Sequence, residues 1–134
     1  MPREIKYKIA VIEDDKALSK ALAEKLARAD FDVIQAYDGE EGLWLILKEK
    51  PDLILLDIVM PKMDGMTLLK KLRNNRQDEW AMKVPVIILT NLNADDNITQ
   101  GVARDEPAYY LVKADFAIEQ VIKKVKDCLK IENN

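Results

Sequence analysis

A short apolar run that ends on an acid constrains this chain more than any other stretch. Residues 53–56 are Leu-Ile-Leu-Leu; they follow Pro51-Asp52 and lead directly into Asp57. A run of this length, bounded by turn-forming residues, predicts a strand that is buried on both faces of a sheet. In open α/β sheets the C-terminal end of such a strand reaches the crevice where ligands bind. Asp57 is therefore either a strand-end cap or the centre of a reactive site.

Apolar periodicity divides the remaining chain into strands that alternate with helices. The predicted strands cover residues 7–12, 31–36, 53–57, 84–89 and 109–112. The predicted helices run from an N-cap at Asp15 to Ala29, from 40 to 50, from Met63-Asp64-Gly65 to Leu72, from 94 to 103 and from 116 to 131, with a turn at Asp38-Gly39. This alternation predicts βαβ units, right-handed crossovers and one parallel sheet with helices on both faces. We expect a single α/β domain over 1–134, with a core over about 6–131.

Charge and composition narrow the classes of partner. The net charge is −3 and there is no long basic run, which argues against nucleic acid as the main partner. No apolar run approaches the length of about 18 residues that a membrane span needs, and there is no signal peptide, so we expect a cytoplasmic protein. The single cysteine, Cys128, is expected to be a packing residue in a reducing compartment. Histidine is absent, so any chemistry has to use carboxylates, hydroxyls, lysine or a metal ion.

Four of the predicted strands end on polar residues. These residues are Glu13-Asp14, Asp57, Thr90 and Lys113. Because parallel strands end at the same edge of a sheet, we expect three carboxylates, a hydroxyl and an ammonium group to converge there. Clustered carboxylates favour a cation, and oxygen ligands of this kind suit Mg²⁺. Together these groups are typical of phosphoryl transfer, with Asp57 as the nucleophile, Lys113 and Mg²⁺ neutralising the phosphoryl oxygens, and Thr90 donating a hydrogen bond.

Residues 9–15, 57–65, 88–90 and 110–113 carry a resemblance to a known family. Over nearly its whole length the chain resembles the receiver domain of bacterial two-component response regulators, which are CheY-like. The resemblance implies a flavodoxin-like (βα)5 three-layer sandwich with a parallel five-stranded sheet in the strand order 2-1-3-4-5. It also implies that a histidine kinase or a phosphotransfer protein donates the phosphoryl group to Asp57, and that the domain signals rather than acts as an enzyme.

The resemblance also implies a ligand set for Mg²⁺. In the family, an acidic pair after the first strand and the central aspartate hold the metal. Carried onto this sequence, Asp14 and Asp57 bind Mg²⁺ directly, Glu13 binds through water, and the main-chain carbonyl of Val59 completes the protein ligands.

A conformational switch is implied in the same way. Tyr110 matches the family's switch aromatic, which changes between exposed and buried rotamers as Thr90 is drawn toward the phosphoryl group. The surface that changes is formed in receivers by the fourth helix, fifth strand and fifth helix, here 94–103, 109–112 and 116–131. Through this surface the domain is expected to contact a downstream protein or output domain, and to form a homodimer when phosphorylated. We expect no output domain within this sequence after residue 131, so the chain is either a stand-alone regulator or a receiver cut from a longer protein.

Several residues depart from the family pattern. Many relatives have a cis proline after the lysine, whereas here Ala114 follows Lys113, and Asn91 replaces a small residue next to the site. Val59 and Leu92 are both apolar, at positions that influence how easily water reaches the phosphoryl group. We therefore expect slow self-dephosphorylation.

The two tryptophans and the helix over 94–103 raise separate expectations. Trp80 lies in a connection that is longer than needed, and we expect it to cover part of the core. Trp44 cannot share one helix face with all of its apolar neighbours, so it is expected to be partly exposed or to mark a contact patch. The helix over 94–103 is poor in apolar residues and is expected to pack loosely.

Three other functions remain alternatives. A haloacid-dehalogenase-like phosphatase uses a similar set of groups, but it needs a second aspartate at the position of Val59. A degenerate receiver that binds proteins without being phosphorylated is a second alternative, but all of the key residue types are present here. A nucleotide-binding flavodoxin-like domain is the weakest alternative, because no glycine-rich loop follows the first strand.

Overall fold

The fold is a three-layer α/β sandwich around one parallel sheet. The computed structural model describes residues 6–90, 109–112 and 117–131, and for residues 90 and 109–112 only the main chain is described. The strands are β1 (Lys8–Ile12), β2 (Asp32–Ala36), β3 (Leu53–Asp57), β4 (Val86–Thr90) and β5 (Tyr109–Val112). They lie in the order β2-β1-β3-β4-β5 and every neighbouring pair is parallel, which confirms the predicted topology.

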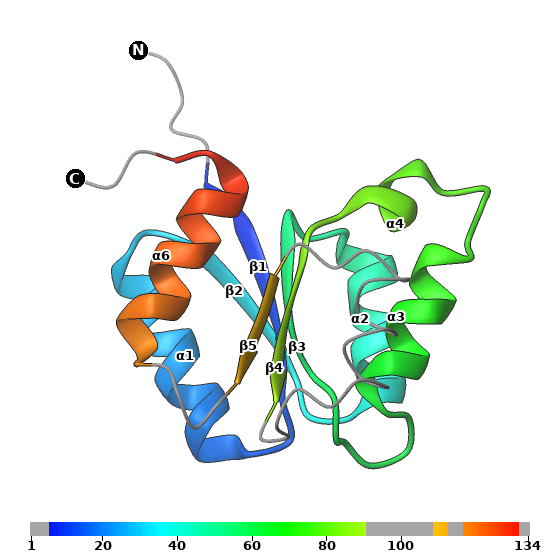
Figure 1. The fold of residues 1–134 in the computed structure, drawn as a ribbon, viewed down its shortest axis with the longest axis horizontal. Helices are drawn as coiled ribbons and strands as arrows, with labels where there is room; N and C mark the ends of the chain where they lie inside the picture. The colour runs from blue at the N-terminus through cyan, green and yellow to red at the C-terminus, as the bar shows by residue number, and fades with distance from the viewer. Residues whose placement is uncertain (1–5, 91–108, 113–116, 132–134) are drawn as a thin grey trace.

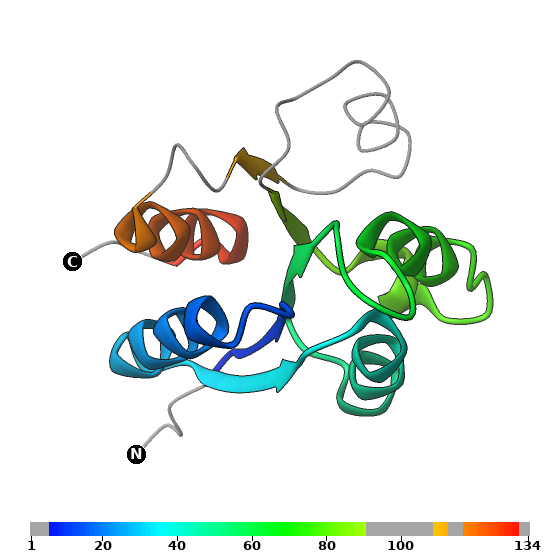
Figure 2. The same cartoon turned by 90° about the horizontal axis from the view of Figure 1, so that it is seen from below.

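Helices cover both faces of the sheet. They are α1 (Lys16–Arg28), α2 (Gly39–Glu49), α3 (Gly65–Arg73), α4 (Glu79–Lys83) and α6 (Ile118–Leu129). Helices α1 and α6 lie on one face, and α2, α3 and α4 lie on the other (Figure 1). The strands end at the lower edge of the sheet in Figure 1, and this edge faces the viewer in Figure 2. None of the helices in these described segments is long and apolar enough to cross a membrane.

The core consists of two apolar clusters, one on each face of the sheet. Alternate residues of a strand point to opposite faces, so Ile9 and Val11 pack under α1 and α6 while Ala10 and Ile12 pack under α2 and α3. All five residues of β3 are buried. This central position explains the uninterrupted apolar run, because a strand covered on both faces has no solvent-exposed side.

Aspartates begin four of the helices. In each case a side-chain oxygen accepts a hydrogen bond from the third main-chain N–H along, which satisfies an otherwise unpaired donor of the first turn. The four pairs are Asp15 with Leu18, Asp38 with Glu41, Asp64 with Thr67, and Asp78 with Ala81. The predicted cap at Asp15 is confirmed. At Asp38-Gly39 the predicted turn is instead the start of α2, because Asp38 caps the helix and Gly39 is its first residue.

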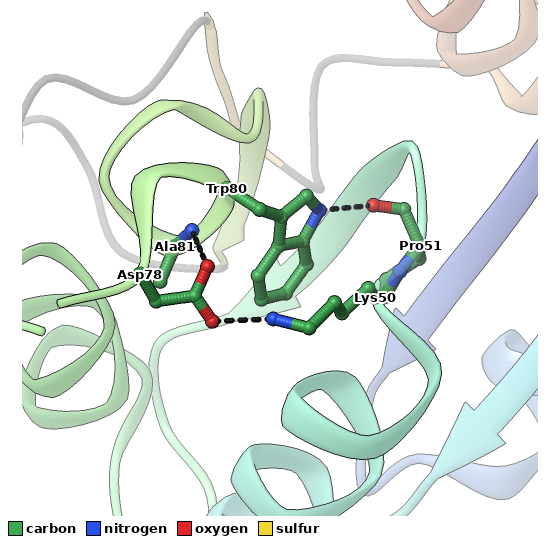
Figure 3. A network of polar contacts seen from close by, with 5 residues as sticks. All are labelled: Lys50, Pro51, Asp78, Trp80 and Ala81. Atoms are coloured by element: carbon green, nitrogen blue, oxygen red, sulfur yellow. Dashed lines mark hydrogen bonds and ion pairs between the residues drawn. The ribbon is translucent and has the colours of Figure 1, made fainter.

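The connection between α3 and β4 contains the short helix α4, which the sequence did not predict. Its Trp80 packs against the core and donates a hydrogen bond from Nε1 to the carbonyl oxygen of Pro51 at 2.8 Å (Figure 3). The ammonium group of Lys50 pairs with Asp78 and lies 5.0 Å from the centre of the Trp80 ring. From α3, Arg73 donates hydrogen bonds to the carbonyl oxygens of Ala81 and Val84. Trp80 therefore covers part of the core, as expected.

The remaining predictions about the fold concern Trp44, the last helix, and two segments outside the described residues. The side chain of Trp44 is 60% exposed on α2, with the Lys48 ammonium 4.9 Å from the centre of its ring, so partial exposure is confirmed. The last helix starts at Ile118, where the Gln120 side chain accepts a hydrogen bond from the main chain of Ala117. The predicted helix over 94–103 and the Lys113–Ala114 bond lie outside the described residues.

Candidate functional site

Three carboxylates meet where β1 and β3 end. Glu13 and Asp14 follow β1, and Asp57 is the last residue of β3. One carboxylate oxygen from each lies within 4.8 Å of the others. Glu13 and Asp57 are buried, whereas Asp14 is exposed to solvent. The strand-end pattern predicted that these carboxylates converge, and they do. The cluster is partly buried, with Asp14 open to solvent.

The strand register explains why these residues converge. Ile12 pairs with Leu56, so the residues that follow, Glu13 and Asp57, are adjacent across the two central strands. Asp57 pairs with Leu89 of β4, so the main chain of Thr90 lies one residue further along the neighbouring strand. The main chain of Thr90 therefore reaches the edge of the sheet where the carboxylates lie.

The remaining predicted residues are described only in part. Tyr110 belongs to β5 and pairs with Ile88, but the structure describes only its main chain. Lys113, which follows β5, lies outside the described residues, as do Asn91 and Leu92. The structure therefore brings the three acids together and places the main chain of Thr90 near them. The roles of the Thr90, Tyr110 and Lys113 side chains stay predictions.

The three acidic residues in the turn after β1, Glu13, Asp14 and Asp15, have different roles. Glu13 donates its main-chain N–H to the carbonyl oxygen of Ala36 at 3.0 Å, which ties the turn to β2. Its carboxylate Oε2 accepts the main-chain N–H of Asp15 at 3.0 Å, and Asp15 in turn caps α1. Glu13 and Asp15 thereby hold the turn in place, and the exposed Asp14 between them is available to a ligand.

The donor set fits a hard divalent cation. Every side chain in the cluster offers carboxylate oxygen, and the oxygens are close enough to share one ion. Three negative charges at this spacing repel one another, and a cation between them removes the repulsion. Mg²⁺ prefers oxygen ligands and retains several waters, which suits a cluster that is open on one side. The residues present therefore fit a magnesium site.

The loop after β3 packs closely against Asp57. The main-chain N–H of Gly65 donates to the carbonyl oxygen of Ile58 at 2.7 Å, and Asp64 caps α3. A Cβ atom built on Gly65 would be 2.1 Å from the carbonyl oxygen of Asp57, so only glycine fits here. Val59, in the same loop, has a side chain that is 61% exposed. That the main-chain carbonyl oxygen of Val59 is a metal ligand stays a prediction.

Two glycines shape the site in a way that was not predicted from the sequence. Gly39 and Gly65 each allow a close approach of main chain to the loop formed by residues 58–64. A sequence signal for this role exists in the Asp-Gly pair that occurs at 38–39 and again at 64–65. In both pairs the aspartate caps a helix and the glycine is the first residue of that helix.

Comparison with known proteins agrees with this geometry. The family model described as the response regulator receiver domain matches residues 9–126. Among curated proteins, the chain is similar to the DNA-binding dual master transcriptional regulator RpaA of Synechocystis, with 36% identity over 130 residues. That match covers 97% of this chain and 50% of RpaA, so the chain spans about half the length of this relative.

Two solved structures give the same result. The receiver domain of the Francisella response regulator 1452 superposes with a TM-score of 0.83 at 34% identity, covering 93% of this chain and 98% of that one. The BeF3-activated N-terminal receiver domain of Klebsiella pneumoniae RstA has a TM-score of 0.75 at 32% identity, covering 89% of this chain and 95% of that one. The fold therefore has counterparts among solved receiver domains.

Proposed function

This chain belongs to the response regulator receiver domain family, and on that premise we propose that Asp57 accepts the phosphoryl group. A receiver is a signalling module of two-component systems and not an enzyme in its own right. This membership leaves no support for the phosphatase or the nucleotide-binding alternative.

The approach of the three carboxylates to within 4.8 Å of one another carries the proposal. Asp57 is the member that lies at the end of the central strand, where open α/β sheets bind their ligands. In the proposed step a carboxylate oxygen of Asp57 attacks the phosphorus of a phosphohistidine. A new O–P bond forms, the N–P bond breaks, and the imidazole of the donor leaves.

The other groups support this step. Asp14 and Asp57 would bind Mg²⁺ directly, Glu13 would bind it through water, and the main-chain carbonyl of Val59 would complete the protein ligands. The bound ion would neutralise charge on the phosphoryl oxygens. The buried, hydrogen-bonded Glu13 and the exposed Asp14 are consistent with this division. Lys113 neutralises a second phosphoryl oxygen, and Thr90 donates a hydrogen bond to a third.

Phosphorylation at this site changes a surface that other proteins bind. The contact of Thr90 with the phosphoryl group draws Tyr110 inward and shifts the surface formed by residues 94–103, β5 and α6 between two states. A histidine kinase or phosphotransfer protein is the donor, and a downstream protein or output domain reads the altered surface. Phosphorylation favours a homodimer through the same surface. The chain acts in the cytoplasm as one receiver domain over 1–134, without direct contact to nucleic acid or membrane.

Intact-mass spectrometry tests the proposal. The protein is incubated with Mg²⁺ and acetyl phosphate, beside the variants Asp57→Ala and Asp14→Asn. We expect wild type to gain the mass of one phosphoryl group, Asp57→Ala to gain none, and Asp14→Asn to gain it only slowly. Absence of the gain in wild type, with Mg²⁺ binding retained, would favour a receiver that binds partners without being phosphorylated.

A further inference from the structure

The start of α2 is in direct contact with the loop formed by residues 58–64. A Cβ atom built on Gly39 would lie 1.8 Å from the carbonyl oxygen of Met63, so the two main chains touch at this point. The main-chain N–H of Gly39 also donates to the carbonyl oxygen of Pro61 at 3.4 Å. Because this loop contains Val59, the contact joins α2 to a segment that borders the acidic cluster.

A pair of opposite charges reinforces the contact. Asp38 uses Oδ1 to accept the main-chain N–H of Glu41, which caps α2, and its Oδ2 lies 3.8 Å from the ammonium nitrogen of Lys62. Lys62 has a φ of 68°, in the left-handed region that a residue with a side chain rarely adopts. Strained main chain of this kind persists only where neighbouring contacts hold it.

The loop is fixed at its other end as well, and α2 is itself anchored next to the site. The N–H of Gly65 donates to Ile58, and Gly65 lies against the main chain of Asp57. A Cβ atom built on Gly42 would be 2.6 Å from a side-chain methyl group of Ile12, the residue before Glu13. A displacement of the loop from α2 would therefore move Val59 relative to carboxylates that stay in place.

We propose that Asp38 and Lys62 are positioning residues for the metal site. Together they hold loop 58–64 against the first turn of α2, keep the main chain of Val59 beside Asp14 and Asp57, and thereby raise the affinity for Mg²⁺. This inference rests on the proposed function, because it deepens the account of the same site. Neither side chain contacts the ion in this account, and both act through the main chain of the loop.

The direction in which two substitutions change the affinity for Mg²⁺ distinguishes a positioning role from a direct electrostatic effect. If only the charges acted on Mg²⁺, Asp38→Asn would weaken binding and Lys62→Gln would strengthen it, because a positive charge near the ion would be lost. If the pair positions the loop, both variants weaken binding. Asparagine still caps a helix, so Asp38→Asn removes the charge pair and keeps the cap. Lys62→Arg keeps the charge and is expected to bind Mg²⁺ like wild type.

The chain contains a matched control at the opposite edge of the sheet. Asp78 has the same two tasks as Asp38, since Oδ1 accepts the N–H of Ala81 at the start of α4 and Oδ2 pairs with Lys50. Asp78→Asn therefore removes a similar but shorter ion pair, shown in Figure 3, and α4 lies at the end of the sheet opposite the edge where the strands end (Figure 1). We expect it to leave the Mg²⁺ affinity unchanged.

Isothermal titration calorimetry with Mg²⁺ alone, together with thermal unfolding in its absence, is the test. We expect Asp38→Asn and Lys62→Gln each to raise the dissociation constant for Mg²⁺ by about two- to fivefold, the size of effect expected from the loss of a part-exposed ion pair. Tighter binding by Lys62→Gln, unchanged binding by both variants, or equal weakening by Asp78→Asn would overturn the inference. Asp14→Asn serves as the reference: if it binds Mg²⁺ like wild type, the proposed metal site itself is wrong, whereas if it alone loses binding, only the positioning role fails.

Discussion

Gly65 and Asp57 are in main-chain contact, because a Cβ atom at Gly65 would lie 2.1 Å from the carbonyl oxygen of Asp57 and 2.9 Å from Cα of Ile58. The start of α3 is thereby seated on the end of the strand that carries the proposed phosphoacceptor. Main chain cannot move aside as a side chain can, so this contact fixes where loop 58–64 begins and ends.

Gly65→Ala is expected to destabilise the fold by about 1–3 kcal/mol, because the added methyl group overpacks against main chain. It is also expected to weaken Mg²⁺ binding, since the loop has to move away from Asp57. Urea unfolding and calorimetry measure the two effects. Gly42→Ala is the comparison, because its new methyl group meets a side chain of Ile12, and we expect a smaller loss of stability. A Gly65→Ala variant as stable as wild type would contradict the contact.

The lifetime of the phosphorylated form is expected to be long. Val59 presents an exposed apolar side chain next to the site, and such a side chain hinders the approach of a hydrolytic water. Val59→Asn offers a polar group that can orient water, so it is expected to shorten the lifetime several-fold, whereas Val59→Ile is expected to leave it unchanged. Decay of the phosphorylated mass with time provides the measurement. Loss of the phosphoryl group within seconds in wild type would show that the apolar side chain gives no protection.

The ion pair between Lys50 and Asp78 is expected to stabilise the fold in a pH-dependent way. The hydrogen bond from Lys50, more than the charge itself, lowers the pKa of Asp78 below its ordinary value. A carboxyl group whose pKa is lower in the folded state stabilises the protein above its unfolded pKa, and this contribution is lost as the pH falls through the folded pKa. The stability difference between wild type and Asp78→Asn is therefore expected to be full at neutral pH and to shrink below about pH 4.

Urea unfolding of both proteins across this pH range provides the measurement. The comparison isolates Asp78, because the other carboxylates titrate equally in the two proteins. A difference that stays constant down to the lowest pH at which the protein folds would show that the pair contributes nothing.

Cys128 is expected to be slow to react. It is half-buried against the cluster under α1 and α6, and burial, with a smaller contribution from Asp127, raises the pKa of its thiol to about 11. Only the thiolate is nucleophilic, so at neutral pH we expect alkylation by iodoacetamide to be at least about tenfold slower than for free cysteine. The rate of mass gain as a function of pH measures this. A rate equal to that of free cysteine at neutral pH would contradict the packing role.

Much of the fold could be predicted because local sequence signals and tertiary structure agree. The apolar run before Asp57 predicts a strand that is buried on both faces, and β3 is buried along its whole length. The acids at the ends of β1 and β3 were expected to converge because parallel strands end at one edge, and they do. The strand order, in contrast, came from the family resemblance, since the alternation of strands and helices does not fix it.

Two features could not be predicted because they depend on contacts between distant segments. The helix α4 is only five residues long, too short to be stable from local propensity, and it depends on Arg73 and on the hydrogen bond from Trp80 to Pro51. The roles of Gly39 and Gly65 are visible only once the neighbouring main chain is in place.

Chemical mapping of the acyl phosphate tests the central claim most directly. Borohydride reduces a phosphorylated aspartate to homoserine, so tandem mass spectrometry of the peptides after incubation with acetyl phosphate and Mg²⁺ identifies the modified residue. We expect homoserine at position 57 alone, and only when Mg²⁺ is present. Homoserine at position 14 or 15, or the five-carbon product of reduced glutamate at position 13, with none at position 57, would contradict it.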